Sequence, residues 1–333
     1  MTKPSVSVAL CTYNGVKYLQ EQLDSIASQE MKVAEIVISD DGSSDSTSEV
    51  VAAFSRKHAA LVRFRKNANR LGYTKNFEQA ISLCRGDIIF LSDQDDFWFP
   101  NKVERVAHAF AHNKQCAVVA AGAIVADQNL NPTGKTLSLK QQGPPGERQT
   151  FSARCQQSFA YGCTLALRAS LRPVILPISS RWGHDNWICF IASMFSEIQS
   201  IKEPLMLYRR HSASAGRNDK LDFGTPKQLL AAYKRGTGFD YQIDREQWQD
   251  MYEHLQKIVG GGLPSNASDG ILNRNAAVLD GVRTRLDFSK RRLEMIVSPR
   301  PFRLLAASRL LFSGQYHEFV SGWRSLARDL LVA

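Results

Sequence analysis

The chain has 333 residues, of which 44% are hydrophobic and 22% are charged, and its formal net charge is +10. This length allows one large domain, or one domain with a smaller appendage, and the composition excludes a collagenous, coiled-coil or wholly disordered protein. The longest apolar run, residues 116–126, is shorter than the roughly 20 residues that span a bilayer. We expect no secretory leader and a cytoplasmic protein, with its six cysteines reduced and no zinc site, because no CxxC pair or metal-ligand spacing occurs.

The first 115 residues alternate between two kinds of hydrophobic pattern. Runs typical of buried strands occupy residues 6–11, 35–39, 62–65 and 87–92, and helical spacing occupies residues 18–28, 47–57 and 74–84. Such alternation predicts an α/β fold with a doubly wound, mostly parallel sheet. Ligands of these folds bind beyond the carboxyl ends of the strands, where three polar turns of this sequence lie.

The remainder of the chain is less regular. Residues 127–150 are rich in Pro, Gly and Gln, which predicts a mobile loop, and strand character returns at 158–168 and 204–208. From about residue 224 the pattern is helical. We therefore predict a catalytic domain over residues 1–223 and a basic helical region over 224–333. Within that region the spacing predicts an apolar stripe on one helix, interrupted near Gly314. The stripe consists of Phe312, Tyr316, Phe319, Trp323, Leu326 and Leu330.

The most informative turn is the acidic one that follows residues 87–92. Asp93, Asp95 and Asp96 crowd three carboxylates at a strand end, where their mutual repulsion is costly unless a cation compensates. Mg²⁺ and Mn²⁺ prefer oxygen ligands and often share them with substrate phosphates, so this turn suits a nucleoside diphosphate. A solvated turn that caps the next helix explains the same residues.

Two further turns lie at the same predicted edge. Asp40 and Asp41 follow the second strand, and a helix cap alone does not require two adjacent carboxylates there. Tyr13 and Asn14 follow the first strand and offer a ring and an amide that suit a nucleobase, although a tyrosine in such a place more often packs.

These motifs together resemble a known enzyme family. CTYNG, VISDDGSSDST, NRLGYTKNFEQA and FLSDQDDFWFPNK occur in the order found in inverting glycosyltransferases of family 2, which have the GT-A fold. YGCTLALR, GHDNW and PLMLYRRHSASAG look like the acceptor-side motifs of bacterial rhamnosyltransferases. The resemblance covers about residues 5–217.

The resemblance implies roles on the nucleotide side of the site. Tyr13 is expected to stack on the base and Asp41 to hydrogen-bond it, while Asp40 and Arg70 help to hold the nucleotide. Asp93 is expected near the ribose.

It also implies a metal and a catalytic base. Asp95, and more weakly His211, match positions that contact Mg²⁺ or Mn²⁺, and Asp185 of GHDNW matches the base that takes the acceptor's proton. A helix cap is the competing interpretation of Asp185. The expected donor is dTDP-rhamnose, with a UDP-sugar as the alternative, and the expected acceptor is a glycan or a lipid-linked glycan.

The basic C-terminal region has two interpretations. Residues 272–333 carry 11 Arg/Lys against 5 Asp/Glu, so an amphipathic helix near Arg324 and Arg328 either packs on the catalytic domain or lies on an anionic membrane at its inner face. No nucleic-acid partner is expected. The rival to an enzyme is a non-catalytic glycan- or nucleic-acid-binding module that uses this region.

Overall fold

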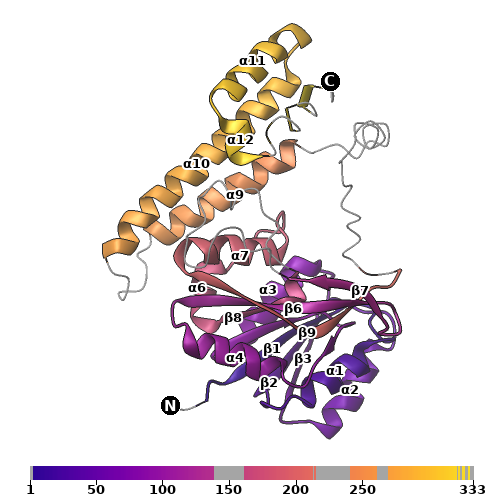
Figure 1. Cartoon of the computed structure of the whole chain (residues 1–333). Helices are drawn as coiled ribbons and strands as arrows, with labels where there is room; N and C mark the ends of the chain where they lie inside the picture. Colours follow the sequence, from indigo (N-terminus) through magenta and orange to yellow (C-terminus); the bar gives the residue numbers. More distant parts are fainter. Residues whose placement is uncertain are drawn as a thin grey trace. The chain divides into compact units, whose positions relative to one another are not determined.

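The computed structural model describes residues 3–138, 161–212, 214, 241–260, 269–320, 322, 325–326 and 329–330. By its internal contacts the chain divides into two compact units. The first comprises residues 1–142 and 158–213, and the second comprises 143–157 and 214–333 (Figure 1). The predicted boundary at residue 223 lies outside the described residues and stays a prediction.

The first unit is built on one mixed sheet. Its strands are β1 (Val6–Thr12), β2 (Glu35–Asp40), β3 (Val62–Lys66), β4 (Ile88–Ser92), β5 (Phe97–Trp98), β6 (Cys116–Ala126), β7 (Pro132–Leu137), β8 (Leu165–Arg168) and β9 (Glu197–Arg209). They are ordered β3-β2-β1-β4-β8-β6-β9-β5, and β7 pairs with β6. The first four strands are mutually parallel, β6 and β9 share their direction, and β5, β7 and β8 run the opposite way. The α/β class and the mostly parallel sheet are therefore confirmed.

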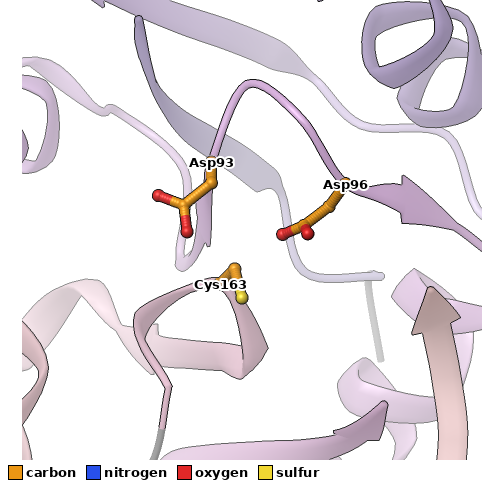
Figure 2. Close-up of side chains that lie close together, drawn as sticks. All are labelled: Asp93, Asp96 and Cys163. Carbon is orange, nitrogen blue, oxygen red and sulfur yellow. The ribbon is translucent and has the colours of Figure 1, made fainter. Parts of the chain in front are cut away.

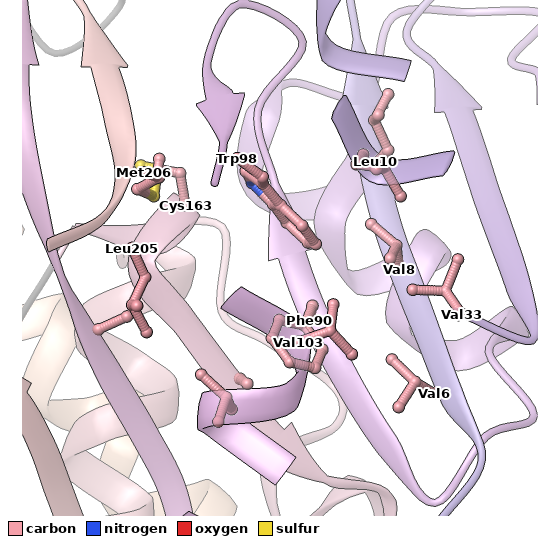
Figure 3. Close-up of a cluster of buried hydrophobic side chains, with 14 of the residues drawn as sticks. Val6, Val8, Leu10, Val33, Phe90, Trp98, Val103, Cys163, Leu205 and Met206 are labelled. Atoms are coloured by element: carbon pink, nitrogen blue, oxygen red, sulfur yellow. The ribbon is translucent and has the colours of Figure 1, made fainter. Parts of the chain in front are cut away.

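Helices cover both faces of this sheet. The helices of this unit are α1 (Leu19–Ala27), α2 (Thr47–Lys57), α3 (Tyr73–Leu83), α4 (Lys102–His112), α6 (Arg172–Ile175) and α7 (His184–Phe195). Val6, Val8 and Leu10 of β1 alternate onto one face, and there they join buried side chains of α1, α2 and α4 in one core (Figure 3). α3 packs on β1 and β2, and its buried Phe77 lies outside this core, on the other face.

The register brings the three polar turns to one edge. Thr12 at the end of β1 is opposite Asp40 at the end of β2, and Leu10 is opposite Ser92 at the end of β4. The parallel strands thus deliver their following turns to a common place, as the sequence pattern predicts.

Two predictions about the later chain are wrong. Residues 132–137 of the predicted loop form β7, because their backbone groups complete the ladder of β6, although their side chains are mostly exposed; residues 139–150 lie outside the described part. The apolar stripe does not lie on one helix, since α11 ends at Phe312 and α12 ends at Phe319. Gly314 separates these helices with a positive φ of 78°, which favours glycine.

The second unit is helical where it is described. It contains α9 (Tyr241–Gly260), α10 (Asp269–Val297), α11 (Arg300–Phe312) and α12 (Gln315–Phe319). Its core gathers side chains from three of these helices with Leu326, including Tyr316 and Phe319. A fully buried ion pair joins Arg292 to Asp329 at 2.7 Å. The hydroxyls of Tyr241 and Tyr316 donate to the same carboxylate, at 2.7 and 2.8 Å.

No helix in the described part of the chain combines the length and the apolar character needed to cross a membrane. Trp323, Arg324 and Arg328, on which part of the amphipathic-helix prediction rests, lie outside the described residues.

Glu35 supplies a first prediction, because it ties three strands and a turn together. Its carboxylate accepts hydrogen bonds from Ser7 on β1 at 2.7 Å, from Arg63 on β3 at 3.0 Å, and from the amide of Arg85 before β4. Burial by itself raises the pKa of Glu35, but the hydrogen bonds from Ser7, Arg63 and Arg85 outweigh it, and the net pKa is lowered.

We expect Glu35→Gln to lose about 1–3 kcal/mol of unfolding free energy at neutral pH, since the amide cannot accept all of these bonds. Because the pKa of Glu35 is lower in the folded state, its carboxylate stabilises the folded protein at pH values above the unfolded-state pKa of about 4.3. This stabilisation is lost as the pH falls through the folded-state pKa. Urea unfolding of both proteins at a series of pH values measures the difference, which should shrink in acid. A difference of constant size across that series contradicts the assignment.

Candidate active site

The acidic turn after β4 lies against the short helix η1 (Gly162–Thr164), which precedes β8. Potential ligand atoms of Asp93, Asp96 and Cys163 all lie within 4.8 Å of one another. Figure 2 shows Asp93 and Asp96 on the two sides of the turn, with Cys163 on the neighbouring segment. Asp96 is 0% exposed and Cys163 is 1% exposed, so two of the three groups are withdrawn from solvent.

Crowding and burial perturb these acids strongly. Burial, followed by the charges of Asp95 and Asp185, raises the pKa of Asp93 to about 7. Burial, followed by the charges of Asp95 and Asp93, raises the pKa of Asp96 well above its usual value. Among the described residues, Oδ2 of Asp96 is buried with no hydrogen-bond partner. The cluster therefore has unmet demand for positive charge.

One positive charge is built into the fold beneath the cluster. Lys102, the first residue of α4, is 1% exposed, and its ammonium donates to the carbonyl oxygen of Cys163 at 3.1 Å. The ammonium also lies 4.0 Å from the centre of the Trp98 ring. Burial lowers the pKa of Lys102 to about 8, while the charges of the Cys163 thiol, Asp96 and Asp93 act in the opposite direction.

The two predicted metal ligands meet at the outer side of this cluster. Nε2 of His211, which follows β9, lies 2.8 Å from Oδ2 of Asp95. The His211 ring lies 4.7 Å from the ring of Tyr18. Arg209 fixes the turn from behind, since its guanidinium donates to the carbonyl of Asp95 at 2.7 Å and to Glu21 at 2.6 Å. A carboxylate and an imidazole are thus held together at a partly open place.

Tyr13 and Arg70 are also brought together. The Arg70 guanidinium lies 4.0 Å from the centre of the Tyr13 ring, which is 38% exposed. The backbone of Tyr13 is clamped by Gln94 of the acidic turn, which accepts from its amide at 2.8 Å and donates to its carbonyl at 3.0 Å. An aromatic face therefore adjoins the acidic turn.

The carboxylates of Asp40 and Asp41 both bind neighbouring loops. Asp40 is 0% exposed, and its carboxylate accepts from the hydroxyls of Thr12 and Ser43, at 2.6 and 2.5 Å. Asp41 is 3% exposed and accepts from the amides of Leu71 and Gly72, at 2.6 and 2.9 Å. In this structure both carboxylates hold loops in place, and Asp41 fixes the segment that carries Arg70.

Asn14 joins the turns after β1 and β2. Its φ of 49° lies in the left-handed region, which asparagine tolerates better than most residues. Its amide donates to the hydroxyl of Ser43 at 2.8 Å, and its side-chain oxygen accepts from the amide of Ser44 at 2.9 Å. Asn14 therefore stabilises the edge on which Tyr13 is presented.

Asp185 lies in the first turn of α7. The helix begins at His184 after Gly183, so the competing interpretation of Asp185 as the N-cap is not what the structure shows. The side chain accepts from the following amide, of Asn186, at 2.7 Å. Its charge contributes to the raised pKa of Asp93, which places Asp185 within electrostatic range of the acidic turn.

Close packing fixes α7 next to η1. A Cβ on Gly162 would lie 2.3 Å from Nε2 of His184, so only glycine fits where these two segments meet. The His184 ring stacks on Phe77 of α3, with 4.0 Å between the ring centres. The indole of Trp187 donates to the carbonyl of Ile175 at 2.8 Å. Asp185 is therefore held by rigid neighbours.

Sequence reasoning singled out neither Lys102 nor Cys163. Lys102 stands at the end of FWFPNK, where a lysine at a helix start normally faces solvent, so its burial has no local signal. Cys163 gains its position from the pairing of β8 with β4, which is distant in sequence. Asp96 belongs to the predicted acidic cluster, and its position next to Asp95 is enough to make it a candidate site residue.

A comparison with known families identifies the family of this chain. Residues 7–173 match the model of glycosyl transferase family 2. The chain belongs to that family. The match contains the turns after β1, β2 and β4 and the residues of η1, but it ends before Asp185 and His211.

Individual relatives of this glycosyltransferase agree. It is 27% identical over 217 residues to an uncharacterized glycosyltransferase of Nostoc sp., covering 63% of this chain and 66% of that protein, slightly less than two thirds. It is 33% identical over 108 residues to a dTDP-rhamnosyl transferase of Shigella flexneri, covering 31% of this chain and 37% of that protein. S. aureus TarS in complex with UDP-GlcNAc shares the fold at a TM-score of 0.50 and 15% identity, covering 97% of this chain and 90% of that one. The predicted GT-A fold is confirmed.

The buried ammonium gives a prediction for this site. Lys102→Met keeps most of the side chain's volume but removes the charge beneath Asp93 and Asp96. We expect a loss of about 3 kcal/mol near pH 7.5, where Asp93, with a pKa of about 7, is mostly ionised and Lys102, with a pKa of about 8, is mostly protonated, because removing one buried charge leaves the opposite charge uncompensated. At pH 5.5 Asp93 is protonated, so the loss should be smaller.

Thermal unfolding at both pH values measures this effect, with Lys114→Met at an exposed position as the matched control. An equal loss at both pH values would show that Lys102 contributes only packing.

Proposed function

We propose that this glycosyltransferase moves a sugar from a nucleoside diphosphate to an acceptor hydroxyl with inversion, and that Asp185 is the general base. The observation that supports this most is electrostatic: the charges of Asp185 and Asp95 both act on Asp93. The charge of Asp185 on α7 thus acts on the turn after β4, although the two segments are distant in sequence. An inverting transfer needs a general base on one side of the sugar donor and a cation site on the other side.

The donor would lie along the edge formed by the three turns. Tyr13 would stack on the base, Arg70 would move to meet the nucleotide, and Asp93 would face the ribose. Asp41 would hydrogen-bond the base and Asp40 would help to hold the nucleotide. Asp41 also holds the amides of Leu71 and Gly72 beside Arg70.

The residues present fit a divalent cation. Asp95 and His211 approach to 2.8 Å, and a buried oxygen of Asp96 is unpartnered in the described part of the chain. Carboxylate oxygens are the ligands that suit Mg²⁺ and Mn²⁺. When bound, the ion neutralises the departing diphosphate. We assign Asp95 and His211 to hold it.

The transfer is a single displacement. The acceptor oxygen forms a bond to the anomeric carbon, and the bond from that carbon to the diphosphate oxygen breaks, with its electron pair leaving on the diphosphate. Asp185 takes the proton of the acceptor hydroxyl as the new bond forms. Attack from the face opposite the leaving group inverts the anomeric carbon.

The donor we propose is dTDP-rhamnose, with a UDP-sugar as the alternative, and the acceptor is a growing, lipid-linked bacterial surface glycan. The Shigella flexneri dTDP-rhamnosyl transferase supports this assignment through its 33% identity over 108 residues. The rhamnosyltransferase-like motifs around Gly162 and Asp185 support it independently. Such an acceptor is consistent with a cytoplasmic enzyme at the inner face of the membrane.

Two substitutions separate the base from the metal site. Asp185→Asn should reduce kcat by about 10²–10⁴-fold, the usual contribution of a general base, and leave nucleotide binding unchanged. Asp95→Ala should abolish transfer and also weaken nucleoside diphosphate binding in the presence of Mn²⁺. Calorimetry with and without Mn²⁺ measures the binding, with Asp24→Asn on the exposed side of α1 as the control. Full transfer by Asp185→Asn would overturn the base assignment.

The donor can be identified by stabilisation. With Mn²⁺ present, dTDP-rhamnose should raise the unfolding temperature of the full chain more than UDP-, GDP- or other dTDP-sugars do, because a ligand that binds only the folded state stabilises it. A larger increase with a UDP-sugar would replace the donor assignment. No increase with any donor would favour a non-catalytic module.

A further inference from the structure

The outward face of α11 is unusually apolar. Phe302, Leu304, Leu305 and Phe312 are 64%, 64%, 53% and 88% exposed. Val297 at the end of α10 is 74% exposed. A helix on the surface of a globular unit normally turns its polar residues outward, and exposed large apolar side chains gathered in one place mark an interaction site. We call these five residues the α11 face.

The other side of the same helix is already occupied. Ala307 and Leu310 of α11 are 2% and 5% exposed and belong to the core of the helical unit. Arg303 of α11 donates to the carbonyl of Ser298 at 2.6 Å, which fixes the start of the helix. The α11 face therefore belongs to a packed helix, and rotating the helix to bury it would expose the present core residues.

The charge on α11 itself has one sign, although the exposed Glu294 of α10 stands one turn before Val297. α11 contains Arg300, Arg303 and Arg309, and no aspartate or glutamate occurs from residue 297 to residue 317. Arg309 is exposed and stands four residues after Leu305 and three before Phe312, so its charge lies on the apolar side of the helix. Apolar side chains with arginine beside them suit a partner that has an apolar interior and negatively charged groups at its surface.

We propose that the α11 face docks on the surface of an anionic lipid bilayer, with its phenylalanine and leucine side chains among the acyl chains and Arg309 at the headgroups. Helices with this distribution lie in the plane of the interface. Such binding accords with the absence of a membrane-crossing helix in the described residues. The proposal rests on the proposed function only in that a lipid-linked acceptor would make this location useful.

Vesicle binding by the full chain tests the proposal. The chain should sediment with vesicles of phosphatidylcholine and phosphatidylglycerol at least tenfold more strongly than with phosphatidylcholine alone, since each arginine near an anionic surface contributes about fivefold. The triple variant Phe302→Ser, Leu305→Ser, Phe312→Ser should lose this binding. Arg309→Glu should weaken it roughly tenfold. Ile243→Ser, at a 47% exposed position on α9, is the matched control and should bind as the unchanged chain does.

Three results would overturn the proposal. The chain could fail to bind the anionic vesicles, or the triple variant could bind as well as the unchanged chain. The chain could also be a dimer without lipid that the triple variant converts to a monomer, with no vesicle binding, in which case the α11 face joins two copies. Helical circular dichroism and a thermal unfolding profile equal to those of the unchanged chain confirm that the helical unit of the triple variant is folded. Because vesicle binding needs no donor, it fails or holds independently of the transferase activity.

Discussion

The repulsion among carboxylates at the end of β4 is the constraint on which the site depends. Burial and neighbouring negative charge raise the pKa of Asp93 and Asp96, so the free protein holds these groups at a cost. The fold offsets part of that cost internally, with the buried Lys102 ammonium. What remains is a preference for an added cation. The proposed divalent cation would relieve this repulsion when it binds.

The sheet makes this concentration of charge possible. Parallel strands end at one edge, and hydrogen bonds between their following turns hold the edge rigid: Gln94 clamps Tyr13, Asn14 joins the next turn, and Asp41 fixes the loop before α3. The close contact of Gly162 with His184 then holds η1 against α7. Contacts between these backbone segments thus fix the positions of residues that are distant in sequence.

Much of this arrangement follows from local pattern, and the exceptions have physical reasons. The strands that end near Thr12, Asp40 and Ser92 are readable because each is a short apolar run followed by polar residues. β7 escapes prediction because backbone pairing, and no hydrophobic pattern, stabilises it. The burial of Lys102 and the engagement of Asp41 by backbone amides depend on tertiary contacts. The sequence predicts which chemical groups lie at this edge. It does not predict which of them form hydrogen bonds within the protein.

The stacking of Arg70 on Tyr13 bears on how a nucleotide is selected. With the guanidinium 4.0 Å from the ring centre, that aromatic face is already occupied in the free protein. A base that takes the same face exchanges one stacking partner for another, and only the difference between the two energies contributes to affinity. If Tyr13 stacks on the base as proposed, the displaced Arg70 guanidinium would become available to a phosphate. The pair would then favour charged nucleotides over neutral nucleosides.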